Sequence, residues 1–157
     1  MDINEFSKKF LFGPQGVDSV QWYQSRNGVY ATDGSMFLLP RDMLKFGVLY
    51  LNKGTWNGER ILSEDWVTES FTTYNNNVGI NIPIEDSGKN AYGYLWWISE
   101  LDYKGAKIKM YRANGWGGQT IMVFPELRTV VVFTSGNYAS TSKLFKVINR
   151  YVLPAIE

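Results

Sequence analysis

Apolar positions recur at helical spacing in the first part of the chain. After Asp2, apolar side chains appear every three to four residues until Gly13-Pro14, a pair that ends a helix. Asp2 and Glu5 have the spacing of a capping box at the start of this helix. Pro40 fits the first turn of a second helix, which is predicted to run to about Asn52. The residues between these two helices, 15–39, are predicted to be mostly loop.

A hairpin turn and a third helix follow. Asn57-Gly58 is the dipeptide that favours a tight hairpin turn. Ser63 is a good N-cap, and the acidic residues after it suit the positive end of a helix dipole. The third helix is therefore predicted from Ser63 to about Thr73.

The pattern changes to strands after residue 90, which completes an α+β arrangement. A closing amphipathic helix is predicted from Ser140 to Val152. The order predicts helices first, then an antiparallel meander, then a C-terminal helix on one face of the sheet. One unit is expected over 1–157, with a helical and loop part at 1–90 and strands plus a helix at 91–157. The predicted strands are Tyr92–Ser99, Lys107–Ala113, Gln119–Phe124 and Thr129–Thr134.

Composition excludes several kinds of chemistry. The 157 residues include no Cys and no His, so thiol nucleophiles, Ser-His-Asp triads and Cys or His metal sites are excluded. No metal site and no cofactor is indicated. A net charge of +1 gives no electrostatic drive toward nucleic acid or an anionic membrane, and no apolar run is long enough to span a bilayer. Because the first residues do not resemble a signal peptide, the chain is expected either to work in the cytoplasm or to have lost the beginning of a parent protein.

The glycine-rich segment Ala113–Gln119 is the sharpest candidate for a ligand site. Three of its residues are glycines, which let a backbone approach a ligand closely or form a tight hairpin. A phosphate loop is excluded, because the segment lacks the GxxxxGK[ST] pattern and no helix follows. The pair Trp96-Trp97 is predicted to place one ring on each face of a strand, with one ring in the core and the other lining a cleft.

Two short motifs match catalytic patterns by letter only. Ser140–Lys143 reads SxxK, the nucleophile and base of penicillin-recognising enzymes, but Ser140 sits where the last helix needs a cap. Tyr74–Asn76 reads Y-x-N within a polar run after a helix. We interpret both as local structure.

Several segments together resemble one family, in the order in which that family carries them. The chain is similar to the C-terminal portion of the serine β-lactamase-related hydrolases, which include class C β-lactamases, DD-peptidases and related esterases and amidases. The segments that carry the resemblance are Phe12–Val17, Leu38–Gly47, Asn57–Val67, Tyr92–Trp97, Ala113–Gln119, Pro125–Leu127 and Val130–Val132.

The resemblance implies part of a β-lactamase/transpeptidase-like fold and an acyl-enzyme mechanism on amide or ester bonds. The SxxK and Y-x-N motifs of the family lie upstream of the segment that resembles residue 1, so the chain alone is expected to be inactive. Ala113, Asn114 and Gly115 take the place of the Lys-Thr-Gly or His-x-Gly element, and the backbone N–H of Trp116 takes that of an oxyanion-hole donor. Trp96 and Trp97 are expected to help bind substrate. Since Ala113 offers no cation for a substrate carboxylate, esterase, amidase or peptidase activity is favoured over β-lactamase activity.

The expected partners follow from the same resemblance. They are a small-molecule or peptide substrate in the complete enzyme and the missing N-terminal part of the domain. A homo-oligomer formed through the uncharged strand at 129–134 is also expected, because an open edge strand pairs readily with another strand. The sequence does not give the compartment of the parent protein, and the resemblance leaves a periplasmic or secreted one open. The alternative is a stand-alone aromatic-rich binding module, for example for carbohydrate.

Overall fold

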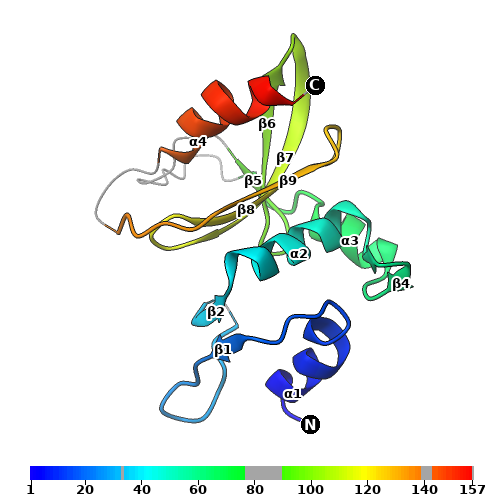
Figure 1. The fold of residues 1–157 in the computed structure, drawn as a ribbon, viewed down its shortest axis with the longest axis vertical. Helices are drawn as coiled ribbons and strands as arrows, with labels where there is room; N and C mark the ends of the chain where they lie inside the picture. Colours follow the sequence, from blue (N-terminus) through cyan, green and yellow to red (C-terminus); the bar gives the residue numbers. More distant parts are fainter. Residues whose placement is uncertain (33, 77–89, 139–142, 157) are drawn as a thin grey trace.

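The centre of the molecule is a five-stranded antiparallel meander with the order β5-β6-β7-β8-β9. A computed structural model describes residues 1–32, 34–76, 90–138 and 143–156 (Figure 1). Because neighbouring strands follow each other in the chain, each pair needs only a short connection. The strands are β5 (Ala91–Tyr92), β6 (Trp97–Tyr103), β7 (Ala106–Gly115), β8 (Gln119–Phe124) and β9 (Thr129–Phe133).

Helices cover the two faces of this sheet (Figure 1). On one face lie α4 (Leu144–Val147) and the turns that continue it, η2 (Ile148–Val152) and η3 (Leu153–Ala155). On the other face lies α2 (Pro40–Leu51), which crosses β8 and β9. The α4 face buries Ile108, Met110, Met122, Phe124, Phe145, Ile148 and Leu153, and the α2 face buries Trp96, Tyr111 and Val123. The predicted α+β architecture is confirmed.

The N-terminal part, residues 1–39, lies below α2 in Figure 1. The chain begins with α1 (Ile3–Ser7), continued by a π-helical turn, η1 (Lys8–Phe12). Its capping box is present: the Glu5 N–H donates to Asp2 Oδ1 at 2.8 Å, and the Asp2 N–H donates to Glu5 Oε2 at 3.1 Å.

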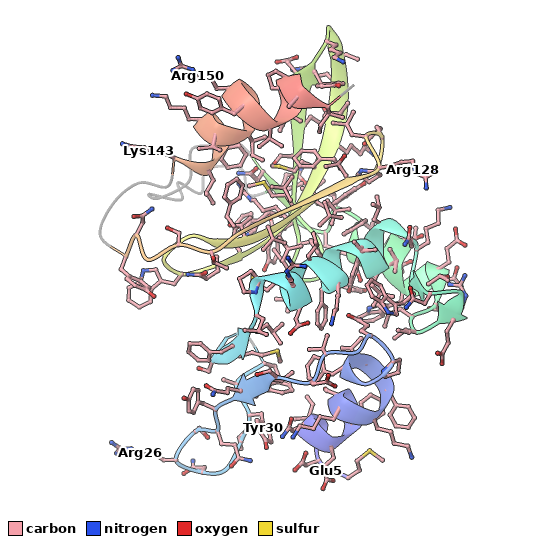
Figure 2. The ribbon with its side chains drawn as sticks, viewed as in Figure 1. Glu5, Arg26, Tyr30, Arg128, Lys143 and Arg150 are labelled. Carbon is pink, nitrogen blue, oxygen red and sulfur yellow. The ribbon has the colours of Figure 1, made fainter. Side chains whose placement is uncertain are left out.

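The prediction of loop over 15–39 was wrong in part. Two short strands, β1 (Val20–Trp22) and β2 (Met36–Leu38), pair as a hairpin. Their residues alternate between half-buried and exposed, but three residues are too few for that period to stand out in the sequence. Figure 2 shows Tyr30, from the loop of this hairpin, beside α1, where its hydroxyl accepts a hydrogen bond from Asn4 at 3.2 Å.

The predicted hairpin and third helix are present. Asn57 and Gly58 have φ of 48° and 85° between β3 (Thr55–Trp56) and β4 (Glu59–Arg60), as a primed turn requires. The Ser63 hydroxyl accepts the Trp66 N–H at 3.1 Å at the start of α3. This helix spans Glu64–Ser70 and ends before the predicted Thr73, because the following residues turn to pair with Tyr92.

The predicted strand Tyr92–Ser99 is in fact interrupted. The chain turns after β5, with the Gly93 N–H donating to the Trp96 carbonyl at 2.8 Å and Leu95 at φ 60°. A Cβ on Gly93 would lie 2.2 Å from the carbonyl oxygen of Ser70, so the close approach of the end of α3 requires a glycine in this turn.

The other three predicted strands are present as β7, β8 and β9. β7 extends beyond the predicted Lys107–Ala113 at both ends. The predicted cap of the last helix, Ser140, lies outside the described residues. Within those residues the helix begins at Leu144, and it turns Phe145 and Ile148 into the core as expected. No helix in the described part of the chain is long and apolar enough to cross a membrane.

Candidate functional site

The glycine-rich segment forms the turn between β7 and β8. Gly115 and Gln119 are the last paired residues, and the Gly118 N–H donates to the Gly115 carbonyl at 3.3 Å. Gly117 and Gly118 have φ of 83° and 93°, a region that residues with a side chain rarely adopt. The glycines of this segment are therefore required by the turn itself, whatever ligand it binds.

Trp116 stands at the tip of this turn and is 76% exposed. Its backbone N–H meets no hydrogen-bond acceptor among the described residues. Its indole packs edge-on against Tyr138, with ring centroids 5.9 Å apart and planes at 89°. The turn thus presents one open backbone donor beside a pair of exposed aromatic rings.

A second loop, residues 134–138, is joined to the turn by hydrogen bonds. The Gln119 side chain accepts a hydrogen bond from the Ser135 N–H at 3.2 Å and donates one to the Ser135 carbonyl. These two bonds extend the β8–β9 pairing beyond the last paired backbone residues. The Asn137 N–H donates to the Gly117 carbonyl at 3.0 Å. A Cβ on Gly117 would lie 2.4 Å from the Tyr138 ring, so the glycine lets the two loops pack together.

Sequence reasoning did not identify Tyr138 as part of this region. The available signal was the run of small and polar residues directly after β9, Ser135–Asn137, which is typical of a loop that packs closely on its neighbour.

The structure divides the predicted site residues between two faces. Ala113 packs with Trp96 in the apolar cluster on the α2 face. Asn114 lies one position along the strand and so points to the α4 face, where Thr120 Oγ1 approaches its Oδ1 at 3.4 Å. Trp97 pairs directly with Arg112, and directly paired residues share a face; Arg112 lies over the Phe145 ring on the α4 face. Trp96, Ala113 and Gly115 are therefore the predicted residues on the α2 face, and Trp116 follows them in the turn.

Trp96 lies in the core, as predicted for one of the two rings, and Trp97 lies on the opposite face. Trp96 lies in the turn before β6 and is 6% exposed, packed against Tyr50 and Phe71 at centroid distances of 4.7 and 5.2 Å. Trp97 is half-buried, with its ring 4.6 Å from that of Tyr92. The ring of Trp96 is thus covered by protein and offers no open face for stacking a sugar.

The turn carries no charge of its own. Residues 113–119 include no Asp, Glu, Lys or Arg. The neighbouring Arg112 is 1% exposed, and its guanidinium lies 4.8 Å from the centre of the Phe145 ring on the α4 face. The described residues hold no cluster of three or more Asp or Glu that could bind a metal ion. Chemistry at this turn would rest on backbone dipoles.

A cavity of about 720 Å³ lies at the other end of β7. Its walls include the stacked rings of Phe71 and Tyr111, 3.7 Å apart, and the side chains of Lys107 and Lys109. Burial, helped by the charge of Glu126, raises the pKa of the Tyr111 phenol. The described lining residues include none from the glycine-rich segment. Tyr111, the one nearest to it along β7, precedes Gly115 by four residues, or about 13 Å at 3.3 Å per residue.

The surroundings of Tyr74, in the segment that matches the Y-x-N pattern, oppose a catalytic role. The Tyr74 phenol is 54% exposed and donates to the Glu69 carboxylate, which raises the pKa of the phenol. A tyrosinate base needs a lowered pKa. Ser140 and its SxxK motif lie outside the described residues.

Comparison with known sequences gives a distant match over part of a longer protein. No protein-family model matches the chain. It is 26% identical over 128 residues to an uncharacterised protein of Alkalihalophilus pseudofirmus, and this match covers 76% of the chain but 35% of that protein.

Solved structures share the fold at low identity. A Bacillus anthracis protein described as a 6-aminohexanoate-dimer hydrolase matches with a TM-score of 0.71 and 21% identity, over 94% of this chain and 36% of that one. The octameric penicillin-binding protein homologue of Pyrococcus abyssi matches with a TM-score of 0.64 and 19% identity, over 96% and 37%. A Bacteroides dorei protein described as a β-lactamase matches with a TM-score of 0.62 and 13% identity, over 91% and 49%. The chain has the fold of part of a β-lactamase-like or penicillin-binding-protein-like hydrolase, and it spans between a third and a half of their length.

Proposed function

We propose that the chain is the C-terminal part of a serine hydrolase that cleaves amide or ester bonds through an acyl-enzyme. The observation that carries the proposal is the open N–H of Trp116 on a glycine-rich turn at the end of β7. The similarity in fold to hydrolases that are two to three times as long supports it.

In the complete enzyme the serine comes from the missing N-terminal part of the domain. As its Oγ attacks the substrate carbonyl carbon, the enzyme's base takes the serine proton, and the carbonyl electron pair moves onto the oxygen. The Trp116 N–H donates to this oxyanion. Collapse of the intermediate expels an amine or alcohol, which takes a proton from the enzyme's base, and water then hydrolyses the acyl-enzyme.

Ala113 narrows the substrate class. Its methyl group packs in the apolar cluster of the α2 face and presents no positive charge beside the turn. A substrate that depends on a carboxylate anchor would lack its partner here. We therefore propose an esterase, amidase or peptidase rather than a β-lactamase.

The chain alone is expected to be inactive, because the proposed mechanism has no first step without a nucleophile and base. Purified chain should give no product burst from nitrocefin or p-nitrophenyl acetate. A burst that is lost in Ser140→Ala would contradict this expectation.

The oxyanion assignment is tested in a longer form that carries the upstream SxxK and Y-x-N motifs. Trp116→Pro removes the backbone N–H, and loss of one such donor lowers kcat by roughly 10²–10³-fold. Trp116→Ala is the matched control, since it removes the exposed ring and keeps the N–H. If kcat falls equally in both variants, the N–H is not the donor.

A further inference from the structure

The cavity along the β6–β7 hairpin has the size of a small-molecule site. Its volume of about 720 Å³ lies within the range of roughly 300–1,000 Å³ that is usual for ligand pockets. The hairpin extends beyond the other strands at the top of Figure 1, and the remaining walls come from β5 and residues 71–73 at the end of α3. These elements lie on the side of the sheet away from β9. The cavity is therefore independent of the turn proposed for acyl transfer.

The floor of the cavity, formed by Ile98, Tyr111 and Phe71, is apolar but carries one buried hydroxyl group. Ile98 and Tyr111 are directly paired across β6 and β7, and the Phe71 ring stacks on that of Tyr111 at 3.7 Å. Tyr111 is 9% exposed, and its hydroxyl has no hydrogen-bond partner among the described residues. Because buried polar groups are normally paired, this hydroxyl is a donor that a ligand in the cavity can satisfy.

Two pairs of opposite charge follow this floor along the same face of the hairpin. Every second residue of β7 shares a face, so Lys109 and Lys107 lie on the side of Tyr111. Lys109 is directly paired with Glu100, and Lys107 with Asp102. The pair nearer the hairpin tip is closed, with Lys107 Nζ 2.7 Å from Asp102 Oδ1. Lys109 and Glu100 line the cavity, and no ion pair joins them in the part of the chain that the structure describes, so both charges remain available to a ligand.

These groups favour a ligand that carries both charges. A simple anion would meet Lys109 but also the carboxylate of Glu100, and the charge of Glu126 acts on Tyr111 as well. A simple cation would leave the ammonium group of Lys109 and the hydroxyl of Tyr111 without an acceptor. An apolar group on the same ligand suits the floor, because it removes apolar surface from water against two aromatic rings.

We propose that the cavity binds a zwitterionic amino acid with an apolar side chain. The carboxylate of the ligand accepts hydrogen bonds from Lys109 and from the Tyr111 hydroxyl, and its ammonium group donates to Glu100. The side chain of the ligand lies on the floor. Because Lys109 and Glu100 are exposed and each bond competes with water, we expect affinity in the millimolar range.

Titration of the full chain with three ligands of similar shape tests this combination of charges. Phenylalanine carries both charges, 3-phenylpropanoate lacks the ammonium group, and 2-phenylethylamine lacks the carboxylate. Phenylalanine should shift the amide resonances of β6 and β7 around the cavity in NMR spectra of isotope-labelled chain. Each of the other two ligands should bind about fivefold or more weakly, because each leaves a charged group of the protein unpaired.

Two results of this titration overturn the proposal. One is the absence of any shift at about 20 mM phenylalanine, well above the expected Kd. The other is equal or tighter binding of 3-phenylpropanoate, which would show a site for simple anions. Shifts confined to residues outside the cavity would likewise place the ligand elsewhere and overturn it.

Single-charge variants assign the two ends of the ligand. Glu100→Gln should abolish the preference for phenylalanine over 3-phenylpropanoate, and Lys109→Gln should abolish its preference over 2-phenylethylamine. Both positions are exposed, so neither change removes a core contact. Lys146→Gln is the matched control, because it removes an exposed charge from α4 on the opposite face of the sheet. If Lys146→Gln changes the Kd as much as Lys109→Gln does, binding is not local to the cavity and the proposal fails.

Tyr111→Phe tests the buried hydroxyl by itself. The substitution keeps the ring that stacks on Phe71 and removes a group without a partner in the described part of the chain. Binding of phenylalanine and 3-phenylpropanoate should weaken, and binding of 2-phenylethylamine should not change, because only the first two carry a carboxylate. Equal weakening of all three ligands would show that the hydroxyl does not meet the carboxylate and would overturn this geometry.

Discussion

At the scale of single residues, the glycine-rich turn depends on groups that are far apart in the sequence. Gln119 holds the backbone of Ser135, and Gly117 leaves space for the ring of Tyr138. The Trp116 N–H stays open because the other hydrogen bonds of the turn are made by its neighbours. The candidate donor is therefore positioned by a small network and not by Trp116 itself.

Gln15 gives the clearest prediction at this scale. Its side chain is 2% exposed, and neither Nε2 nor Oε1 has a hydrogen-bond partner among the described residues. A buried polar group without a partner costs about 1–3 kcal/mol. Gln15→Leu keeps a similar volume and should raise the free energy of unfolding by about 1–2 kcal/mol in urea denaturation.

The matched control at this position is Gln15→Glu. It keeps the shape of the side chain and adds a charge to the same buried space, so it should lower the midpoint of unfolding. If Gln15→Leu also lowers the midpoint, the amide makes a stabilising hydrogen bond in solution.

At the scale of elements, the turn between β5 and β6 carries backbone strain. Leu95 adopts φ 60° and is 63% exposed, so it gains little from burial while holding a left-handed conformation. Leu95→Gly should stabilise the chain by up to about 1 kcal/mol, because glycine adopts this conformation freely. Leu95→Val should destabilise it, since a β-branched residue fits the left-handed region poorly. Thermal unfolding of the two variants distinguishes them, and equal midpoints would show that the turn is not strained.

The packing of α2 on the sheet gives a second prediction for the elements. A Cβ on Gly47 would lie 2.4 Å from Val130 Cγ1 and 2.9 Å from Ile121 Cγ2. Gly47→Ala should therefore lower the free energy of unfolding by about 1–3 kcal/mol, even though alanine favours helix more than glycine does. Gly34→Ala is the control, because no heavy atom lies within 4 Å of its added Cβ. Equal stabilities in urea would mean that α2 packs less closely on β8 and β9.

At the scale of the whole molecule, the N-terminal part is held less firmly than the sheet. Residues 1–39 contribute only Phe12 and Val17 to the buried apolar side chains of the described chain. Their links to α2 include the Phe12–Phe46 ring contact and the hydrogen bond from Lys45 to the Gly16 carbonyl. Local opening should therefore begin here.

Hydrogen exchange at low protein concentration checks this expectation. Amides of α1 and of the β1–β2 hairpin should exchange before those of β7 and β8, the two central strands of the meander. Uniform protection over both parts would show that the chain opens as one cooperative unit.

The sequence by itself determined the elements whose signals are local. Asp2 and Ser63 mark helix starts because their side chains cap the backbone of the first turn. Pro40 marks another because its fixed φ suits the first position of a helix. Asn57-Gly58 marks a hairpin because both residues accept positive φ. Alternation predicted β7, and a continuous apolar run predicted β8, whose two faces both lie in the core.

Only the tertiary structure decided the features that depend on distant neighbours. Position 93 requires a glycine because the end of α3 lies against it, and no residue near Gly93 in the sequence indicates that contact. Trp96 is buried because Tyr50 and Phe71 come from two separate helical segments to cover it. The candidate turn was visible as a run of glycines, but the face on which Ala113 lies and the ring that supports Trp116 are set by strand register and by a loop some twenty residues away. Register and packing are properties of the assembled sheet, and the local sequence pattern does not contain them.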